Sequence, residues 1–230
     1  MKFGIVTFPG SNCDYDAYRA IVDSLGQDAI YLWHKDHDLA GADVVILPGG
    51  FSYGDYLRPG AIARFSPIMR EVASHAKRGG PVLGICNGFQ IACEAGLLPG
   101  ALLRNESLQF VSSPVKLRVD NNQTMFTSAY ARGQVLTLPV AHGDGRFTAD
   151  SSTLAEIESA GQVIFRYASA DGAVGKHANL NGSSNDIAGI VNANGNVLGM
   201  MPHPERALDC LFGSDDGLPL FESILATVAA

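Results

Sequence analysis

The chain has 230 residues, of which 47% are hydrophobic and 17% are charged, and its formal net charge is −7. This composition favours a folded globular protein over a disordered one. The negative charge argues against nucleic acid or an anionic membrane as the main partner. The longest apolar runs are too short to cross a bilayer, and the sequence enters a strand-like pattern at residue 2 without signal-peptide features. We therefore expect a cytoplasmic protein.

Predicted strands and helices alternate through the first hundred residues. We predict strands at residues 2–7, 29–33, 43–47 and 81–85, and helices at residues 14–25, 61–77 and 87–95. The runs at 43–47 and 81–85 are continuously apolar, as strands buried on both faces of a sheet should be. This alternation predicts an open, mostly parallel, doubly wound α/β sheet.

The second half of the chain has a different pattern, which predicts antiparallel strands. These strands are expected at residues 115–119, 135–140, 163–167, 187–192 and 196–201, with helices at 154–159 and 218–228. Ala193-Asn194-Gly195 is a hairpin signal between the last two strands. Because the sequence contains no repeat or linker, we expect one mixed α/β domain over residues 1–230.

The sequence Gly84-Ile85-Cys86-Asn87-Gly88 lies where a buried strand passes into a helix. It is the nucleophile-elbow pattern with cysteine in place of serine. Glycines permit the tight turn, and the positive end of the following helix favours the reactive thiolate. A structural cysteine at a glycine-rich turn fits this motif equally well when the motif is taken alone.

His203-Pro204-Glu205 follows the predicted strand at residues 196–201. Residues two apart in an extended segment point to the same side, so the carboxylate can orient the imidazole. On its own the motif also fits a polar turn. Together with Cys86, however, it predicts a Cys-His-Glu triad in which His203 takes the thiol proton.

A third feature, Pro48-Gly49-Gly50, also follows a buried strand. Acyl transfer passes through a tetrahedral oxyanion, which free backbone N–H groups stabilise. We predict that the N–H groups of Gly50 and Asn87 form this oxyanion hole. The glycines also fit an ordinary turn, whereas a phosphate-binding P-loop is excluded because its lysine motif is absent.

With these three motifs in this order, the sequence resembles the class I (triad) glutamine amidotransferases. Cys86, His203 and Glu205 match the catalytic positions of that family, and Gln90 matches a residue that helps to hold glutamine. The resemblance therefore implies a glutaminase with the fold of that family.

Three longer segments, residues 4–14, 48–60 and 141–147, resemble the glutaminase subunits of phosphoribosylformylglycinamidine synthase. This narrower resemblance implies that ammonia passes to a large synthase subunit, which uses ATP and magnesium to make formylglycinamidine ribonucleotide, with a small accessory subunit in the complex. It implies no cofactor and no metal in this chain.

Three other functions remain open. An α/β-hydrolase-type cysteine hydrolase is disfavoured, because in that class the acid precedes the histidine in the chain, whereas here Glu205 follows His203. A non-enzymatic redox or regulatory domain is disfavoured by the complete triad. The third alternative is the glutaminase of another synthase, and only the three longer segments argue against it.

Several remaining residues receive weaker interpretations. Residues 34–38 (His-Lys-Asp-His-Asp) are expected to be a solvated loop, because a metal site needs more ligands in suitable spacing. For His142 and Asp144, a pocket-lining role and a simple turn are equally favoured. Cys13, Cys93 and Cys210 are expected to be structural. The long connection at residues 48–60 is expected to be functional.

Overall fold

The computed structural model describes residues 1–228, and its largest element is a nine-stranded sheet. The strands of this sheet are β1 (Lys2–Thr7), β2 (Asp28–Trp33), β3 (Val44–Leu47), β4 (Val82–Ile85), β6 (Val111–Val119), β7 (Val135–His142), β9 (Val163–Ala168), β10 (Ile187–Val191) and β11 (Val197–Met200). Their order across the sheet is β2-β1-β3-β4-β11-β10-β9-β6-β7. A separate two-stranded sheet pairs β5 (Ala101–Leu103) with β8 (Arg146–Thr148).

The α-helices within residues 1–228 are fewer than the strands. They are α1 (Asp14–Arg19), which continues as a π turn at Ala20–Ser24, α2 (Ile68–Lys77), α3 (Asn87–Glu94), α4 (Ser151–Ser159) and α5 (Leu218–Val228). Short 3₁₀ turns occupy Ser52–Asp55, Ala63–Phe65, Ser184–Asp186, Pro204–Arg206 and Cys210–Phe212. Within residues 1–228, no helix has the length and apolar character needed to span a membrane.

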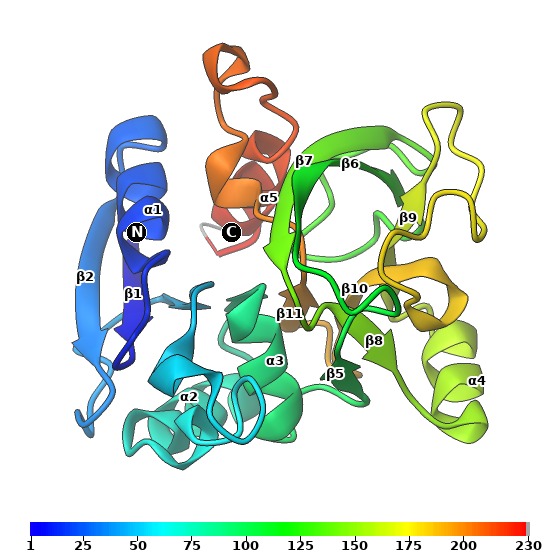
Figure 1. The fold of residues 1–230 in the computed structure, drawn as a ribbon. Helices are drawn as coiled ribbons and strands as arrows, with labels where there is room; N and C mark the ends of the chain where they lie inside the picture. The colour runs from blue at the N-terminus through cyan, green and yellow to red at the C-terminus, as the bar shows by residue number, and fades with distance from the viewer. Residues whose placement is uncertain (229–230) are drawn as a thin grey trace.

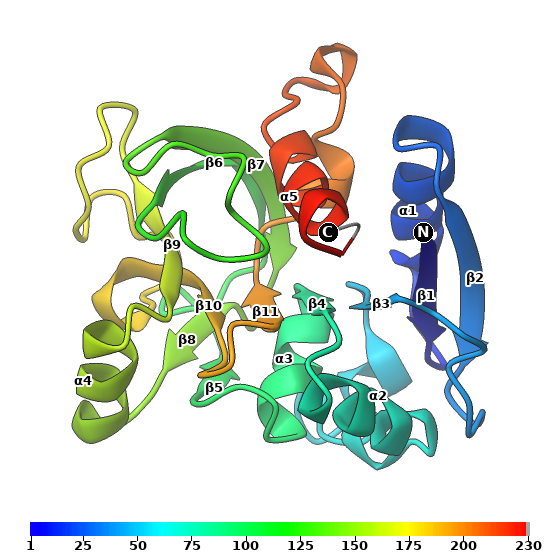
Figure 2. The same cartoon turned by 180° about the vertical axis from the view of Figure 1, so that it is seen from behind.

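The sheet has a parallel half and an antiparallel half. Strands β2, β1, β3, β4 and β11 are mutually parallel, whereas β10, β9, β6 and β7 continue the sheet with antiparallel pairings. Figures 1 and 2 show α1 and α5 on one side of the parallel half and α2 and α3 on the other, while β6, β7 and β9 curl away from it. The predicted fold class is confirmed.

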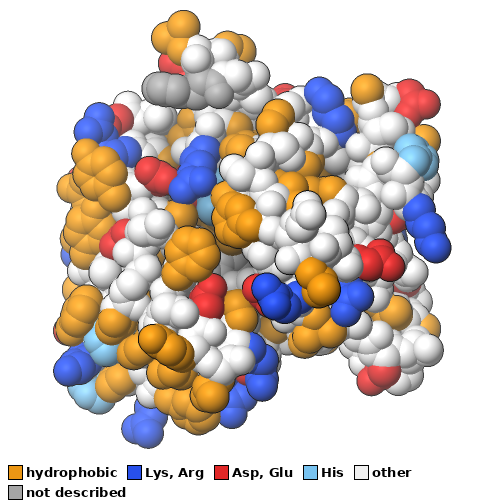
Figure 3. Space-filling view, in the orientation of Figure 1, with side chains coloured by type: hydrophobic (Ala, Val, Ile, Leu, Met, Phe, Trp, Pro, Cys, Tyr) orange, Lys and Arg blue, Asp and Glu red, His pale blue; other side chains and the backbone are white. Residues whose placement is uncertain are grey.

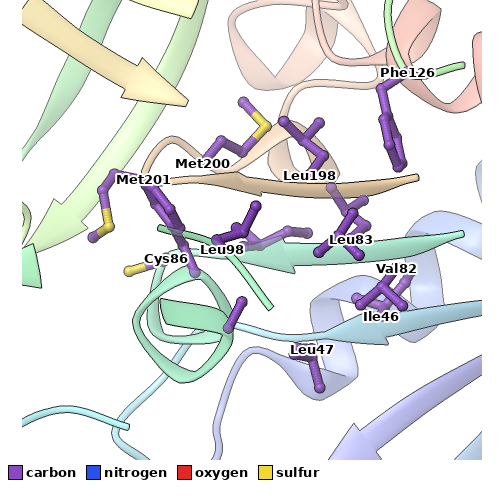
Figure 4. Packing of buried hydrophobic residues seen from close by; sticks show 14 of the residues in the cluster. Ile46, Leu47, Val82, Leu83, Cys86, Leu98, Phe126, Leu198, Met200 and Met201 are labelled. Atoms are coloured by element: carbon purple, nitrogen blue, oxygen red, sulfur yellow. The ribbon is translucent and has the colours of Figure 1, made fainter. Parts of the chain in front are cut away.

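The hydrophobic core lies between the sheet and its helices. Residues of β3, β4 and β11 are fully buried, and Figure 4 shows Ile46, Leu83 and Leu198 from these three strands packed together. Strands covered on both faces need apolar side chains in both directions, which explains the continuous apolar runs in the sequence.

The structure corrects some predicted boundaries. Residues 61–77 do not form one helix, because Ser66 is extended before Pro67 and only residues 68–77 are α-helical. Proline disfavours the α conformation in the residue before it. The strand predicted at 115–119 begins at Val111, and β5 and β8 were missed because three-residue strands carry too little periodicity to be recognised.

Candidate active site

The carboxyl ends of four parallel strands meet at one edge of the sheet. The loops after β1, β3, β4 and β11 carry Cys13, Gly50, Cys86 and His203, respectively. Strands β4 and β11 are direct neighbours, with Ile85 opposite Met200. Residues that are far apart in the sequence therefore lie together where open α/β sheets bind their ligands.

Cys86 occupies a strained turn between β4 and α3. Its φ of 51° and ψ of −105° are unusual for a residue with a side chain. The turn is held by the Cys86 N–H, which donates to the Met200 carbonyl at 2.7 Å. A Cβ on Gly88 would lie 1.8 Å from the Leu47 carbonyl oxygen, so glycine is required there. Figure 4 shows the Cys86 sulfur at the end of its strand, directed away from the labelled core residues.

The sulfur lies at the amino end of α3, where it contacts the antiparallel half of the sheet. The Cys86 carbonyl accepts hydrogen bonds from the Phe89 and Gln90 N–H groups, and the thiol lies 3.6 Å from the Ala141 carbonyl oxygen. The Cys86 sulfur therefore lies between the amino end of α3 and the end of β7.

His203 and Glu205 form a buried pair next to Cys86. Nδ1 of His203 lies 2.6 Å from Oε1 of Glu205, and the two side chains are each only 1% exposed. Burial disfavours a charged ring, but the Glu205 carboxylate and Cys86 outweigh it and raise the pKa of His203 above its ordinary value. Within residues 1–228, Nε2 of His203 has no hydrogen-bond partner. This ring nitrogen is therefore free to exchange a proton.

Cys13 lies closer to this pair than the sequence suggested. A Cβ on Gly49 would lie 2.8 Å from Cε1 of His203 and 3.3 Å from the Cys13 sulfur, so both side chains pack on that glycine. Nη2 of Arg206 donates to the Cys13 sulfur at 3.1 Å. Burial nevertheless raises the pKa of the Cys13 thiol to about 12, which makes it a poor nucleophile.

The two predicted oxyanion donors come from different loops: Gly50 follows β3, and Asn87 directly follows Cys86 in the elbow. Gly50 has a φ of 122°, and a Cβ there would lie 2.5 Å from Oδ1 of Asn12. An isolated antiparallel bridge joins Gly50 to Ser11. Asn87 is the first residue of α3, and the N–H groups of a first helical turn have no intrahelical acceptor. The backbone at Asn87 is therefore suited to binding an oxyanion.

Both ends of the Gln90 side chain are bonded within the protein. Its Oε1 accepts from Nδ2 of Asn87 at 2.8 Å, and its Nε2 donates to the Asp144 carbonyl at 2.7 Å. The Asn87 side chain also accepts from the Ser52 N–H at 3.2 Å. In this structure Gln90 therefore links the nucleophile helix to the loop between β7 and β8.

Two cavities meet beside the nucleophile. One, of about 210 Å³, includes Cys86 and Gln90 in its wall, and the other, of about 220 Å³, includes Cys13 and His203. Phe51 and Phe110 contribute to both, and their rings stack with centroids 6.5 Å apart. The first cavity is below the roughly 300–1,000 Å³ of drug-sized pockets, which suits a small metabolite.

The wall of the first cavity contains residues that the sequence did not single out. They include Arg104, Leu108, Phe110 and Ala141, together with His142 and Asp144, whose roles were left open. Nδ1 of His142 bonds to Oδ1 of the buried Asn105 at 3.1 Å. Burial, with a smaller effect from His203, lowers the pKa of His142 to about 4, so this ring is neutral near pH 7.

The solvated loop predicted at residues 34–38 is confirmed at residues 35–38, which are exposed, but the prediction is wrong at its first residue. His34 is not in a solvated loop: it is buried, and its Nδ1 lies 2.7 Å from the Tyr53 hydroxyl. Tyr53 also bonds Ser66 at 3.0 Å, so these three residues attach the loop after β3 to the sheet. Across the described part of the chain, no group of three or more His, Cys, Asp or Glu residues is arranged to hold a metal ion.

Comparison with known proteins gives a consistent family. Residues 1–215 match the CobB/CobQ-like glutamine amidotransferase domain. The phosphoribosylformylglycinamidine synthase subunit PurQ of Salinibacter ruber is 59% identical over 99% of this chain and 97% of its own length. The PurQ subunit of Chlorobaculum tepidum is 60% identical, with 98% and 97% coverage.

Solved structures give the same result for the fold. The PurLQS structure from Thermotoga maritima contains a chain with a TM-score of 0.87 and 44% identity, covering 99% of this chain and 98% of that one. A second glutamine amidotransferase from the same organism, at 15% identity and a TM-score of 0.61, shares the fold. The resemblance found in the sequence is thereby confirmed, and the chain belongs to the PurQ family of phosphoribosylformylglycinamidine synthase subunits, which carry a glutamine amidotransferase domain.

Proposed function

We propose that this chain is the glutaminase subunit of phosphoribosylformylglycinamidine synthase and that Cys86, His203 and Glu205 are its catalytic triad. The observation that carries the triad is the placement of Cys86 on a strained elbow beside the buried His203–Glu205 pair, with Nε2 of His203 unpartnered. The family supplies the reaction: glutamine is hydrolysed to glutamate, and ammonia passes to a synthase subunit.

In the first half of the reaction, Nε2 of His203 accepts the Cys86 proton and the thiolate attacks the side-chain amide carbon of glutamine. The resulting oxyanion binds the N–H groups of Gly50 and Asn87, each donor lowering the barrier by about 3 kcal/mol. His203 then returns its proton to the amide nitrogen. Ammonia leaves, and a thioester between Cys86 and the glutamyl group remains.

In the second half, His203 takes a proton from water and the resulting hydroxide attacks the thioester. A second tetrahedral intermediate collapses to glutamate, and the sulfur regains its proton from His203. Glu205 remains ionised throughout, because its role is to fix the ring tautomer and stabilise the imidazolium. Gln90 acts through position: its bonds to Asn87 and Asp144 hold the pocket wall against the nucleophile helix.

We propose that the partners are a large synthase subunit, which binds ATP and magnesium, and a small accessory subunit. The PurLQS assembly of the Thermotoga relative supports this proposal. The same synthase subunit uses ammonia to convert formylglycinamide ribonucleotide to formylglycinamidine ribonucleotide. We further propose a single domain, since one hydrophobic cluster includes residues from Phe3 to Ile224. A cytoplasmic location and the lack of a resident cofactor are also proposed, on the basis of the sequence and its family resemblance.

We also propose that the isolated chain is a slow glutaminase that docking activates. Free ammonia is protonated in water and lost as a nucleophile, so hydrolysis without a partner would be wasteful. Glycine peptides reorient at little steric cost, so the turn at Gly49 and Gly50 is the element that docking would fix. Equal glutaminase rates with and without the synthase and its nucleotide would contradict this activation but leave the triad standing.

The triad is tested by replacing Cys86 with alanine in the reconstituted complex. Glutamine-dependent synthesis should disappear, while synthesis from added ammonia should continue, because the ATP chemistry belongs to the partner. Cys210→Ala is the matched control, since Cys210 is exposed and lies outside both cavities. Glutamine-dependent synthesis by the Cys86→Ala complex at the control rate would disprove the assignment.

A further inference from the structure

The cavity beside Cys86 contains charges of both signs that the proposed mechanism does not use. Asp55, Arg104 and Asp144 contribute to its wall together with Cys86 and Gln90. Within residues 1–228, none of these three charged side chains forms an ion pair. Figure 3 shows hydrophobic, acidic and basic side chains meeting near the middle of this face of the molecule.

The two carboxylates lack a positive partner. Oδ1 of Asp55 is shielded from solvent and has no hydrogen-bond partner among the described residues. Burial, and then the charge of Asp144, raise the pKa of Asp55 to about 6. A buried carboxylate next to a second carboxylate is stabilised by a cation placed between them. The free protein therefore holds an unsatisfied site for a positive group.

Both acidic residues are positioned by contacts with the rest of the active site. The backbone carbonyl of Asp144 accepts from Nε2 of Gln90, four residues after the nucleophile. Asp55 ends the 3₁₀ turn that includes Tyr53, whose hydroxyl bonds the buried His34. Each carboxylate is therefore carried by a backbone segment that hydrogen bonds hold to the rest of the protein.

Arg104 supplies the opposite charge in the same cavity. It follows β5 directly and precedes the buried Asn105, whose side chain bonds His142 and the Gly145 N–H. An arginine fork binds a carboxylate through two parallel hydrogen bonds. The cavity thus offers one group suited to an anion and two suited to a cation, all beside the sulfur that attacks the amide.

We propose that Asp55 and Asp144 bind the α-ammonium group of glutamine and that Arg104 binds its α-carboxylate. This inference rests on the proposed glutaminase function and names the groups that select its substrate. The cavity then accepts a free amino acid, whose two α-substituents carry opposite charges, and rejects an amide that lacks either one. A site built to pair a charged substrate group discriminates strongly against an analogue that leaves its own charges unpaired.

Two analogues separate the two halves of this recognition. Glutaramate is glutamine without the α-ammonium, and 4-aminobutanamide is glutamine without the α-carboxylate. Hydrolysis of each is measured as ammonia release by the complete complex with its synthase partner. The ratio of kcat/KM for glutamine to that for an analogue is the readout, because a defect in folding or docking lowers both values equally.

We expect Asp55→Asn and Asp144→Asn each to lower the glutamine-to-glutaramate ratio by about 10–100-fold, the size of one charge-assisted hydrogen bond. Arg104→Gln should lower the glutamine-to-4-aminobutanamide ratio by a similar factor. The same variant should keep the glutamine-to-glutaramate ratio within about threefold of the wild-type value, or raise it. Glu106→Gln is the matched control, because Glu106 is exposed near Arg104 but does not line the cavity.

Ratios that stay at the wild-type value in all three variants would overturn the proposal, and a uniform loss of activity toward all substrates would assign these residues to docking instead. The Cys86→Ala complex keeps the two hypotheses apart. If that variant still hydrolyses glutamine, the proposed function fails; if it is inactive while the selectivity ratios do not change, only the recognition proposal fails.

Discussion

The two halves of the sheet make different contributions to the site. The parallel half carries Cys86, His203 and the turn at Gly50 on loops that follow three of its strands. The antiparallel half supplies the opposite wall, through Ala141 at the end of β7 and Asp144 in the loop after it. Reacting groups thus come from strand ends that share one edge, whereas the shape of the pocket comes from loops of the curled strands.

The catalytic residues are more deeply buried than part of the pocket wall. Cys86 and His203 are 5% and 1% exposed, whereas Phe110, on the loop before β6, is 54% exposed. Buried groups in a rigid edge should affect the chemical step, and groups in the exposed wall should affect substrate affinity. Mutations of the triad and of the turn at Gly50 should therefore lower kcat, and mutations in the wall should raise KM.

The largest effect is expected for His203. His203→Ala should reduce glutamine hydrolysis nearly as much as loss of Cys86, by about 10⁴-fold or more, because nucleophile and base act as a unit. Glu205→Gln should also reduce kcat, but by a factor at least ten times smaller than His203→Ala does, since loss of an orienting acid costs less than loss of the base. Steady-state hydrolysis in the complex tests both, with unfolding curves as the control. A Glu205 variant worse than the His203 variant would reverse the two roles.

Gly50→Ala is expected to be next in size. Its Cβ would lie 2.5 Å from Oδ1 of Asn12 and 2.7 Å from the Asn12 nitrogen, so the peptide must turn away. Loss of one oxyanion donor should lower kcat by about a hundredfold or more. Gly26→Ala is a control for backbone strain, because Gly26 also has positive φ but open space around it. Equal kcat values for the two variants would exclude Gly50 from the oxyanion hole.

A smaller effect is expected from pH, and it arises at the pocket wall. A raised carboxyl pKa means that Asp55 is charged above about pH 6 and neutral below it. If Asp55 binds the α-ammonium, KM for glutamine should rise by about tenfold from pH 7 to pH 5, while KM for glutaramate changes much less. Asp144 and Arg104 also face this cavity, so a control is needed that isolates Asp55. In the Asp55→Asn variant, KM for glutamine should lose most of its extra pH dependence relative to KM for glutaramate.

The smallest effect is expected for Cys13, although it packs on the same glycine as His203. Its partner Arg206 is held independently by Asp16, with Nε 2.9 Å from Oδ2, so loss of the sulfur leaves that arginine anchored. Cys13→Ala should therefore change kcat by only about threefold or less. A loss comparable with that of Cys86→Ala would mean that the two cysteines act together.

The sequence predicted the parallel half well because its signals are local. Continuous apolar runs identify strands buried on both faces, and the glycines around Cys86 mark a turn whose packing excludes side chains. The partnership of Cys86 and His203 was predicted from motifs at two strand ends and was supported by the family resemblance, since the spacing of two distant segments does not show that β4 and β11 are neighbours. The interpretation of these residues as a catalytic triad stays a prediction.

The pocket wall was less predictable for a physical reason. Arg104, Phe110 and Asp144 lie on irregular connections, where neither a 3.6-residue nor a two-residue period reports which way a side chain points. His34 was misplaced because it is buried where it meets Tyr53, which belongs to a different loop. Such contacts are set by tertiary packing and leave no local trace in the sequence.

The central claim is that Cys86 alone carries the glutamyl group. The most direct measurement treats the complete complex with a glutamine analogue that bears an electrophile at the amide position, followed by mass spectrometry of the peptides. The account predicts one label per chain, on Cys86, with loss of glutamine-dependent synthesis and survival of ammonia-dependent synthesis. Label on Cys13, which shares the edge of the sheet but has a thiol pKa of about 12, would contradict it.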